Sequence, residues 1–195
     1  MRTLIVLDHP YEGSFTRALV AAATEGLTAA GGEVDLIDLH ADGFDPVMHA
    51  ADLEAWRRGE SVDPMVADYQ QRLLAADRLV LAFPIWWELM PAMTKGFFDK
   101  VLVKGVVYDQ AKPDGLMKTR LTRLTRVTLI TVMSTPDLAY RVVFGNPITK
   151  AVFRGTFRML GVRRLSWRNH CYPAGRTPAQ RAAILARTTA AFQKR

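Results

Sequence analysis

Three short apolar runs constrain the fold of this chain more than any other feature. They fall at 4–7, 78–83 and 127–133, and each has the length and composition of a strand that is covered on both faces. Alternating apolar and polar residues predict an edge strand at 33–39, and a last strand is predicted at 163–171. Apolar residues at helical spacing predict helices between the strands, at 15–30, 52–58, 64–76, 91–102, 147–160 and 177–193.

Strands that alternate with helices predict a parallel sheet with helices on both faces. The three apolar strands belong at the centre and the strand at 33–39 belongs at an edge, which gives the order 2-1-3-4-5. This is the flavodoxin-like three-layer α/β sandwich, and 195 residues fit a single domain over 1–195. Ligands of such sheets bind beyond the carboxyl ends of the strands, so the candidate site segments are 8–16, 84–91 and 134–141.

Charge is distributed unevenly along the chain. Residues 1–100 contain 8 Lys and Arg against 16 Asp and Glu, whereas residues 101–195 contain 18 against 3. A basic half predicts contact with an anionic partner (a phosphorylated cofactor, a membrane, nucleic acid or a partner subunit) or a solvated surface without a ligand. Cys171 is the only cysteine, and no long apolar segment or signal peptide is visible, so we expect a soluble cytoplasmic protein.

The first loop, 8–16, joins a strand to the N-terminus of a helix. Unpaired backbone N–H groups and the helix dipole favour an anion there, and Ser14 and Thr16 add hydroxyl donors. Gly13 allows a ligand to approach the backbone. The alternative is that Ser14 only caps the helix. Neither a G-x-G-x-x-G fingerprint nor a Walker loop is present.

Two adjacent tryptophans, Trp86 and Trp87, lie between Pro84 and Pro91 in the loop after the strand at 78–83. A rigid loop of this composition predicts a flat wall for a planar ring. The alternative is that both indoles cover the end of the core.

Other chemistry has weaker support in the sequence. His40, His49 and His170 lack the spacing of metal ligands, so no metal site is expected. No Ser-His-Asp pattern and no nucleic-acid-binding motif appears, so we expect no nucleic-acid partner. The basic stretch 118–126 is either a solvated run or a contact for the extra phosphate of NADPH.

Two motifs resemble one known family. The segments His9-Pro10…Ser14-Phe15 and Phe83-Pro84-Ile85-Trp86-Trp87…Met90-Pro91-Ala92 are similar to those of the NAD(P)H:quinone oxidoreductase family. That family includes quinone reductases, drug-activity modulators and flavoproteins attached to potassium-efflux systems. The resemblance implies a bound FAD, or FMN in some members, an NAD(P)H donor and a homodimer. It also implies two-electron, ping-pong reduction of a quinone-like acceptor.

The resemblance also assigns residues by position. The flavin phosphate and ribityl end would contact His9, Ser14, Phe15 and Thr16, and the isoalloxazine ring would lie along Pro84, Ile85, Trp86 and Trp87, near their backbone amides. Ser134 and Thr135 replace a Gly-Gly pair of many members, so their side chains would add contacts or narrow the pocket. Tyr140 matches a tyrosine that assists hydride transfer in some relatives, and it would donate a hydrogen bond to the quinone oxygen.

Two alternatives share the same fold. An electron-carrying flavodoxin would use the flavin without a bound substrate. A regulatory flavoprotein would use the basic half to dock on a membrane potassium-efflux transporter, or would contact the membrane peripherally. Azo and nitro compounds stay open as acceptors beside quinones, as does the choice between NADH and NADPH.

Overall fold

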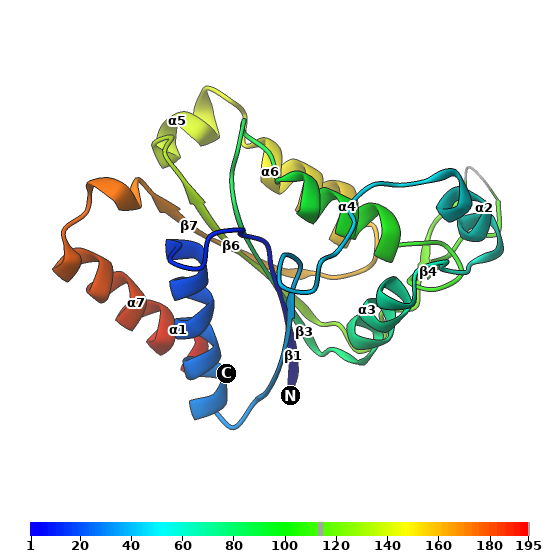
Figure 1. The fold of residues 1–195 in the computed structure, drawn as a ribbon, viewed down its shortest axis with the longest axis horizontal. Coiled ribbons are helices and arrows are strands. Elements are labelled where there is room, and N and C mark those ends of the chain that lie inside the picture. The colour runs from blue at the N-terminus through cyan, green and yellow to red at the C-terminus, as the bar shows by residue number, and fades with distance from the viewer. Residues whose placement is uncertain (113–114, 195) are drawn as a thin grey trace.

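A computed structural model describes residues 1–112 and 115–194 and contains a five-stranded parallel sheet (Figure 1). Its order is β2-β1-β3-β6-β7, so the predicted order 2-1-3-4-5 is confirmed. The strands are β1 (Arg2–Leu7), β2 (Glu33–Asp38), β3 (Arg78–Pro84), β6 (Arg126–Met133) and β7 (Arg164–Cys171).

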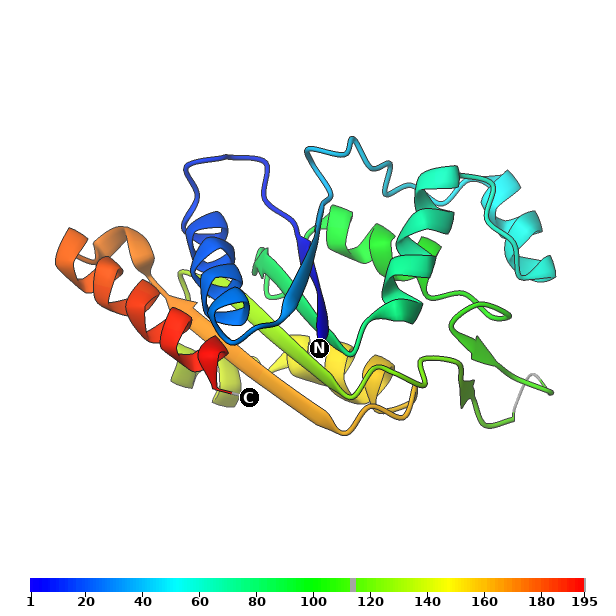
Figure 2. The same cartoon turned by 90° about the horizontal axis from the view of Figure 1, so that it is seen from below.

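Helices cover both faces of the sheet, as predicted (Figures 1 and 2). One face carries α1 (Phe15–Ala29) and α7 (Pro178–Gln193). The other face carries α3 (Pro64–Ala75), α4 (Ala92–Val101), the short α6 (Pro147–Thr149) and η1 (Lys150–Phe157). The connections contain α2 (Ala50–Arg58), α5 (Asp137–Val142) and a short turn, η2 (Pro173–Gly175).

Alternate residues of each central strand face opposite helical layers, which is why these strands are apolar throughout. In β1, Ile5 and Leu7 pack with α1 and α7, whereas Leu4 and Val6 pack with the helices of the other face. Each fully buried side chain of this size contributes about 1.5–3 kcal/mol to folding.

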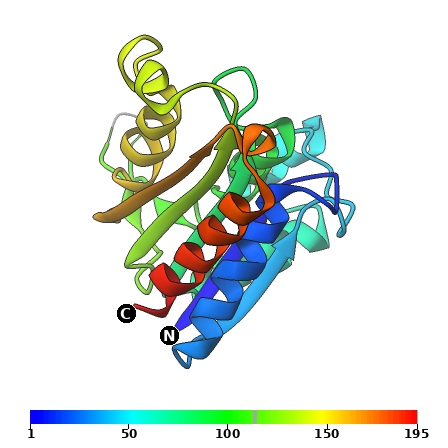
Figure 3. The ribbon, with the colours of Figure 1, turned by 90° about the vertical axis from the view of Figure 1, so that its left-hand side faces the viewer.

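Helix α7 lies along α1 and leaves β6 and β7 partly uncovered (Figure 3). Gly26 permits this close packing, because a Cβ atom at that position would lie 2.3 Å from the carbonyl oxygen of Thr189. The side chains of β7 consequently alternate between exposed and half-buried at its start, starting with an exposed Arg164.

The segment 147–160 was predicted to be one regular helix, and this prediction is wrong in detail. Three α-helical residues lead into a π-helix, in which the Arg158 N–H donates to the Phe153 oxygen at 2.9 Å. The buried residues Val152 and Phe157 are five positions apart, which a π-helix aligns and an α-helix does not.

Two features between 102 and 142 were not predicted from the sequence. Strands β4 (Tyr108–Asp109) and β5 (Lys118–Thr119) form a small antiparallel hairpin, and α5 follows β6. The basic stretch 118–126 leads into the amino end of β6, which is opposite the candidate site. Arg123 in it pairs with Asp77 at 3.0 Å, and the alternative of a contact with the extra phosphate of NADPH stays a prediction.

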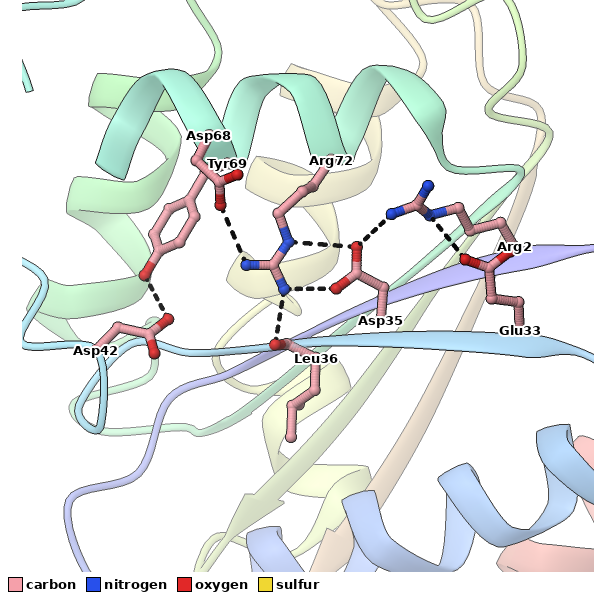
Figure 4. A network of polar contacts seen from close by, with 8 residues as sticks. All are labelled: Arg2, Glu33, Asp35, Leu36, Asp42, Asp68, Tyr69 and Arg72. Atoms are coloured by element: carbon pink, nitrogen blue, oxygen red, sulfur yellow. Dashed lines mark hydrogen bonds and ion pairs between the residues drawn. The ribbon is translucent and has the colours of Figure 1, made fainter. Parts of the chain in front are cut away.

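A polar network joins β2 to α3 and β1 (Figure 4). Arg72 bonds the Asp35 carboxylate through two nitrogens, at 2.5 and 3.2 Å, and the Leu36 oxygen at 2.7 Å. Arg2 adds a 3.0 Å bond to Asp35, and Tyr69 donates to Asp42 at 2.7 Å. Burial by itself raises the pKa of Asp35, but the hydrogen bonds from Arg72 and Arg2 outweigh it and hold that pKa below its usual value.

Among residues 1–112 and 115–194, no helix has the length and apolarity that crossing a bilayer requires.

Candidate functional site

The three predicted site segments meet at the carboxyl ends of β1, β3 and β6. The imidazole of His9 stands edge-on to the ring of Trp86, with centroids 6.3 Å apart. The Thr135 hydroxyl donates to the Glu88 carboxylate at 3.2 Å. Residues from all three loops are therefore in one place, as the parallel sheet predicted.

Asp8 organises the base of this region, a role that the sequence analysis missed. Its carboxylate is buried, accepts hydrogen bonds from the Thr94 backbone N–H at 2.8 Å and hydroxyl at 2.5 Å, and lies 2.9 Å from Nε2 of His40. The N-terminus of α4 is thus occupied by a carboxylate of the protein itself. Of the helices that start beside the first loop, α1 remains available to an external anion.

The N-terminus of α1 opens onto a hollow of about 400 Å³. Ser14 caps the helix by accepting from the Arg17 N–H at 3.2 Å, and it also lines the hollow, so the capping role is present. The lining residues are Gly13, Ser14, Phe15, Ala18, Pro173, Ala174 and Arg181. The guanidinium of Arg181 was not predicted, because only the packing of α7 on α1 brings it there.

Two of the predicted cofactor-binding residues of this loop do not line the hollow. Thr16 is 1% exposed. His9 lies on the Trp86 side of the loop, where its Nδ1 accepts from the Tyr11 N–H at 3.1 Å and its carbonyl accepts from Arg17 at 3.3 Å.

The loop after β3 forms a tight hairpin with an unusual sequence. The N–H of Trp86 donates to the Leu89 oxygen at 3.0 Å, and the reverse bond measures 3.1 Å. Both central residues are left-handed, with φ values of 49° at Trp87 and 67° at Glu88. Turns of this geometry favour Asn-Gly, so Trp-Glu places backbone strain at the mouth of the site.

Hydrogen bonds from two other segments hold the hairpin in place. The buried Tyr140 hydroxyl donates to the Glu88 carbonyl at 2.7 Å and accepts from the Ile148 N–H at 3.2 Å. Burial raises the pKa of Tyr140 to about 12. The predicted donation from Tyr140 to a quinone stays a prediction, and it would require the phenol to release Glu88.

The backbone amides predicted to face a ring are partly committed within the chain. The N–H of Ile85 donates to the Val132 oxygen at 2.8 Å, and that of Trp86 closes the hairpin. The N–H of Trp87 has no partner among the described residues.

The tryptophans themselves do not cover the core. Trp86 is 49% exposed and Trp87 is 98% exposed, whereas Pro84 and Ile85 beneath them are buried. Ser134 is also exposed, next to Thr135. The Trp86 indole is therefore free to form a wall for a ligand.

His170, at the end of β7, adds an unpaired polar atom behind the hollow. Its ring lies edge-on to Phe15 at 6.3 Å, and its buried Nε2 has no partner within the described residues. Burial, reinforced by nearby arginines, lowers the pKa of His170 to about 4, so the imidazole is neutral near pH 7. The described ranges contain no cluster of three His, Cys, Asp or Glu side chains that could hold a metal.

Comparisons with known proteins find relatives of this chain. The chain is 35% identical over 127 residues to NAD(P)H dehydrogenase [quinone] 1 of Rattus norvegicus, which covers 56% of this chain and 46% of the rat protein. The chain thus spans about half the length of the curated relatives it matches. The name of this relative confirms the predicted resemblance to the NAD(P)H:quinone oxidoreductase family.

Solved structures match along the whole chain. Smu.1420 from Streptococcus mutans UA159 superposes with a TM-score of 0.87 at 27% identity, covering 100% of both chains. NAD(P)H:quinone oxidoreductase from Methanothermobacter marburgensis has a TM-score of 0.86 at 23% identity, covering 100% of this chain and 98% of its own. A family model described as a flavodoxin-like fold matches residues 1–195, and the chain belongs to that family.

Proposed function

We propose that this protein is a flavin-dependent NAD(P)H oxidoreductase that reduces quinones or similar acceptors by two electrons. One observation carries the proposal: the open N-terminus of α1 and the exposed wall of Trp86 lie at the same edge of the sheet, on either side of His9. An anion site next to an aromatic wall matches a cofactor with a phosphate at one end and a planar ring at the other.

The phosphate end fits the hollow beside α1. Free N–H groups of the first helical turn and the positive end of the helix dipole favour phosphate, and Arg181 adds a full positive charge. The hollow continues past Phe15 to Pro173 and Ala174, which leaves room for more than one phosphate. On this basis we propose FAD, with FMN as the alternative.

The ring end fits against the hairpin. Trp86 offers its exposed face, and Trp87 offers an N–H without an internal partner. A bound flavin supplies the hydride chemistry between NAD(P)H and the acceptor. The chain's part is to fix the ring and to place the Trp87 dipole where negative charge develops.

Tyr140 and Thr135 act in this proposal as positioning residues. Both bind Glu88, and so they hold the left-handed turn whose backbone faces the ring. Ser134 lies next to them on the solvent side and is available to contact a substrate.

A second copy of the chain would complete the site. Large apolar side chains around the carboxyl end of the sheet are exposed, among them Trp87 at 98%, Val143 at 75%, Leu138 at 74% and Val142 at 71%. Exposed apolar side chains gathered in neighbouring segments are typical of an interface. We therefore propose a homodimer, which light scattering on the purified protein tests.

The first experiment is the visible absorption spectrum of the purified protein, followed by the mass of any released cofactor. Flavin absorption and the mass of FAD are expected. The proposal is wrong if the protein stays colourless after incubation with FAD and with FMN. If a flavin is bound, the second experiment is steady-state kinetics. Double-reciprocal plots of the NAD(P)H oxidation rate against quinone concentration, recorded at several NAD(P)H concentrations, should be parallel, as ping-pong transfer through one shared site requires.

A substitution of Tyr140 tests two roles, namely positioning of the hairpin and direct hydrogen-bond donation to the quinone oxygen. We expect Tyr140→Phe to weaken flavin binding about tenfold and to perturb the flavin spectrum, because the hairpin loses its 2.7 Å bond. Tyr108→Phe is the matched control, since that hydroxyl has no hydrogen bond within the described residues. Unchanged flavin affinity and unchanged turnover in Tyr140→Phe would remove both the positioning and the donor role.

A further inference from the structure

Three arginines stand side by side at the amino ends of neighbouring strands. Arg78 of β3 is in register with Arg126 of β6, which is in register with Arg164 of β7. Parallel strands in register present such residues on the same face, about 4.8 Å apart. Like charges in adjacent positions destabilise a sheet unless something compensates for them.

These arginines line a groove of about 520 Å³ beneath the C-terminal end of α7. The groove exists because α7 lies along α1 and leaves β6 and β7 partly uncovered on this face (Figure 3). Five lining residues are cationic, namely Arg78, Arg126, Arg164, Arg168 and Lys194. No acidic residue of the ranges 1–112 and 115–194 lines it.

Arg78 is the residue that most needs a partner. It is 5% exposed, its Nε makes no hydrogen bond in the described part of the chain, and its guanidinium lies 5.1 Å from the Phe192 ring centroid. Burial, then the charges of Arg126 and Arg168, lower the pKa of Arg78 to about 10. A buried cation without a counter-ion is costly, so the arrangement favours an anion from outside.

Within residues 1–112 and 115–194, no acidic side chain supplies that anion. The carboxylate next to Arg78 in the sequence, Asp77, accepts from the Arg2 N–H at 2.7 Å and from Arg123 at 3.0 Å. The C-terminal end of α7 carries a partial negative charge of about half an elementary charge, which five cations exceed.

The groove is remote from the candidate flavin site. Arg126 begins β6 and Met133 ends it, which separates the two places by roughly 23 Å along the strand. A cofactor bound at the carboxyl edge of the sheet therefore does not account for these charges.

We propose that this groove binds an oligophosphate anion, with Arg78 and Arg126 at its floor and Arg164, Arg168 and Lys194 around it. Guanidinium groups bind phosphate through two parallel hydrogen bonds, and their spacing across the strands suits consecutive phosphates. Thr128 and Ser166, whose hydroxyls are 2.9 Å apart in the groove, retain one proton to donate to the ligand.

The phosphate chain can be free or part of a nucleotide. A neighbouring hollow of about 240 Å³ shares Arg78, Arg126, Phe192 and Lys194 with the groove and adds the apolar side chains of Met1 and Leu27. That hollow has room for a group attached to the phosphates.

The test is calorimetric titration of the full chain with inorganic tripolyphosphate, with and without bound flavin. We expect binding in both forms, which separates this proposal from that of the redox function. Arg126→Gln and Arg168→Gln should each weaken binding at least tenfold. Arg154→Gln, which removes an equal charge on the π-helix beyond the opposite face of the sheet, should leave binding unchanged.

Two further titrants, orthophosphate and ATP, define the ligand. Orthophosphate should bind more weakly than tripolyphosphate, and equal affinity for ATP and tripolyphosphate identifies the free chain as sufficient, whereas tighter ATP binding identifies a nucleotide. The proposal is overturned if tripolyphosphate does not bind at 150 mM NaCl, or if Arg154→Gln weakens it as much as Arg126→Gln. It is equally overturned if only duplex DNA or phosphatidylserine vesicles bind.

Discussion

The polar network on the β2 side and the basic groove on the β6–β7 side differ in whether their cationic side chains have counter-ions within the chain. In the network, Arg72 and Arg2 share the Asp35 carboxylate, so each cation has a counter-ion in the chain itself. In the groove, Arg78, Arg126 and Arg164 are adjacent in register, and no carboxylate of the described ranges lies among them.

This difference indicates which charges stabilise the folded chain by themselves and which require a bound ligand to do so. Paired charges such as those around Asp35 stabilise the folded chain without help. Clustered like charges reduce its stability until a ligand binds, and an arrangement of this kind is typical of a binding surface. The sign of each mutational effect should therefore differ between the two regions.

The largest expected effect is the loss of Arg72. Arg72→Met should lower the free energy of unfolding by about 2 kcal/mol, because Asp35 and the Leu36 carbonyl lose partners in a half-buried site. The matched variant Arg126→Met should change it by about 0.5 kcal/mol or less, in the stabilising direction, because repulsion on Arg78 decreases. Urea denaturation measures both. Equal destabilisation by the two variants would remove the contrast.

Acid should expose the same contrast. The pKa of Asp35 is lowered in the folded state, so its contribution to stability is present above its ordinary value of 3.8 and is lost as the pH falls through the folded pKa. Arg72→Met should therefore show a shallower loss of stability below pH 4 than the wild type, with Arg126→Met behaving as the wild type.

Alkaline pH should affect the groove. The pKa of Arg78 is lowered from 12.5 to about 10, so the folded state releases this proton first and stability increases as the pH rises through about 10. The stability of the wild type relative to Arg78→Met should therefore increase between pH 8 and pH 11. Urea midpoints across that range give the comparison, and a constant difference would contradict the unpaired burial of Arg78.

The smallest effect is that of salt. Raising NaCl from 0.1 to 1 M shortens the Debye length from about 10 to about 3 Å, which screens the arginine row more than the half-buried bonds of Asp35. The stabilising effect of Arg126→Met should disappear at 1 M NaCl, whereas the loss caused by Arg72→Met should persist. Thermal melts in both salt concentrations provide the measurement.

The sheet could be predicted from the sequence because a strand that is buried on both faces is apolar at nearly every position. The three apolar runs at 4–7, 78–83 and 127–133 and the alternation at 33–39 were the basis for the predicted strand order. The location of the site followed from the same order, since the ends of parallel strands coincide.

Details of the site depended on contacts that no local pattern records. The bond from Tyr140 to Glu88 spans 52 positions, and Arg181 reaches the α1 hollow only through helix packing. The left-handed turn at Trp87 and Glu88 contradicts the preference of both residues, so propensity could not predict it. The arginine row needs the strand register, which the sequence does not state.

The π-helix at Lys150–Phe157 has a consequence for how this chain tolerates change in length. Deleting one residue from a regular helix rotates everything beyond it by about 100° and turns its buried face outward. Between Val152 and Phe157, the same deletion would convert the five-residue spacing to a four-residue spacing and leave both side chains on the sheet. Loss of a single codon at this turn should therefore be tolerated without repacking the core beneath it.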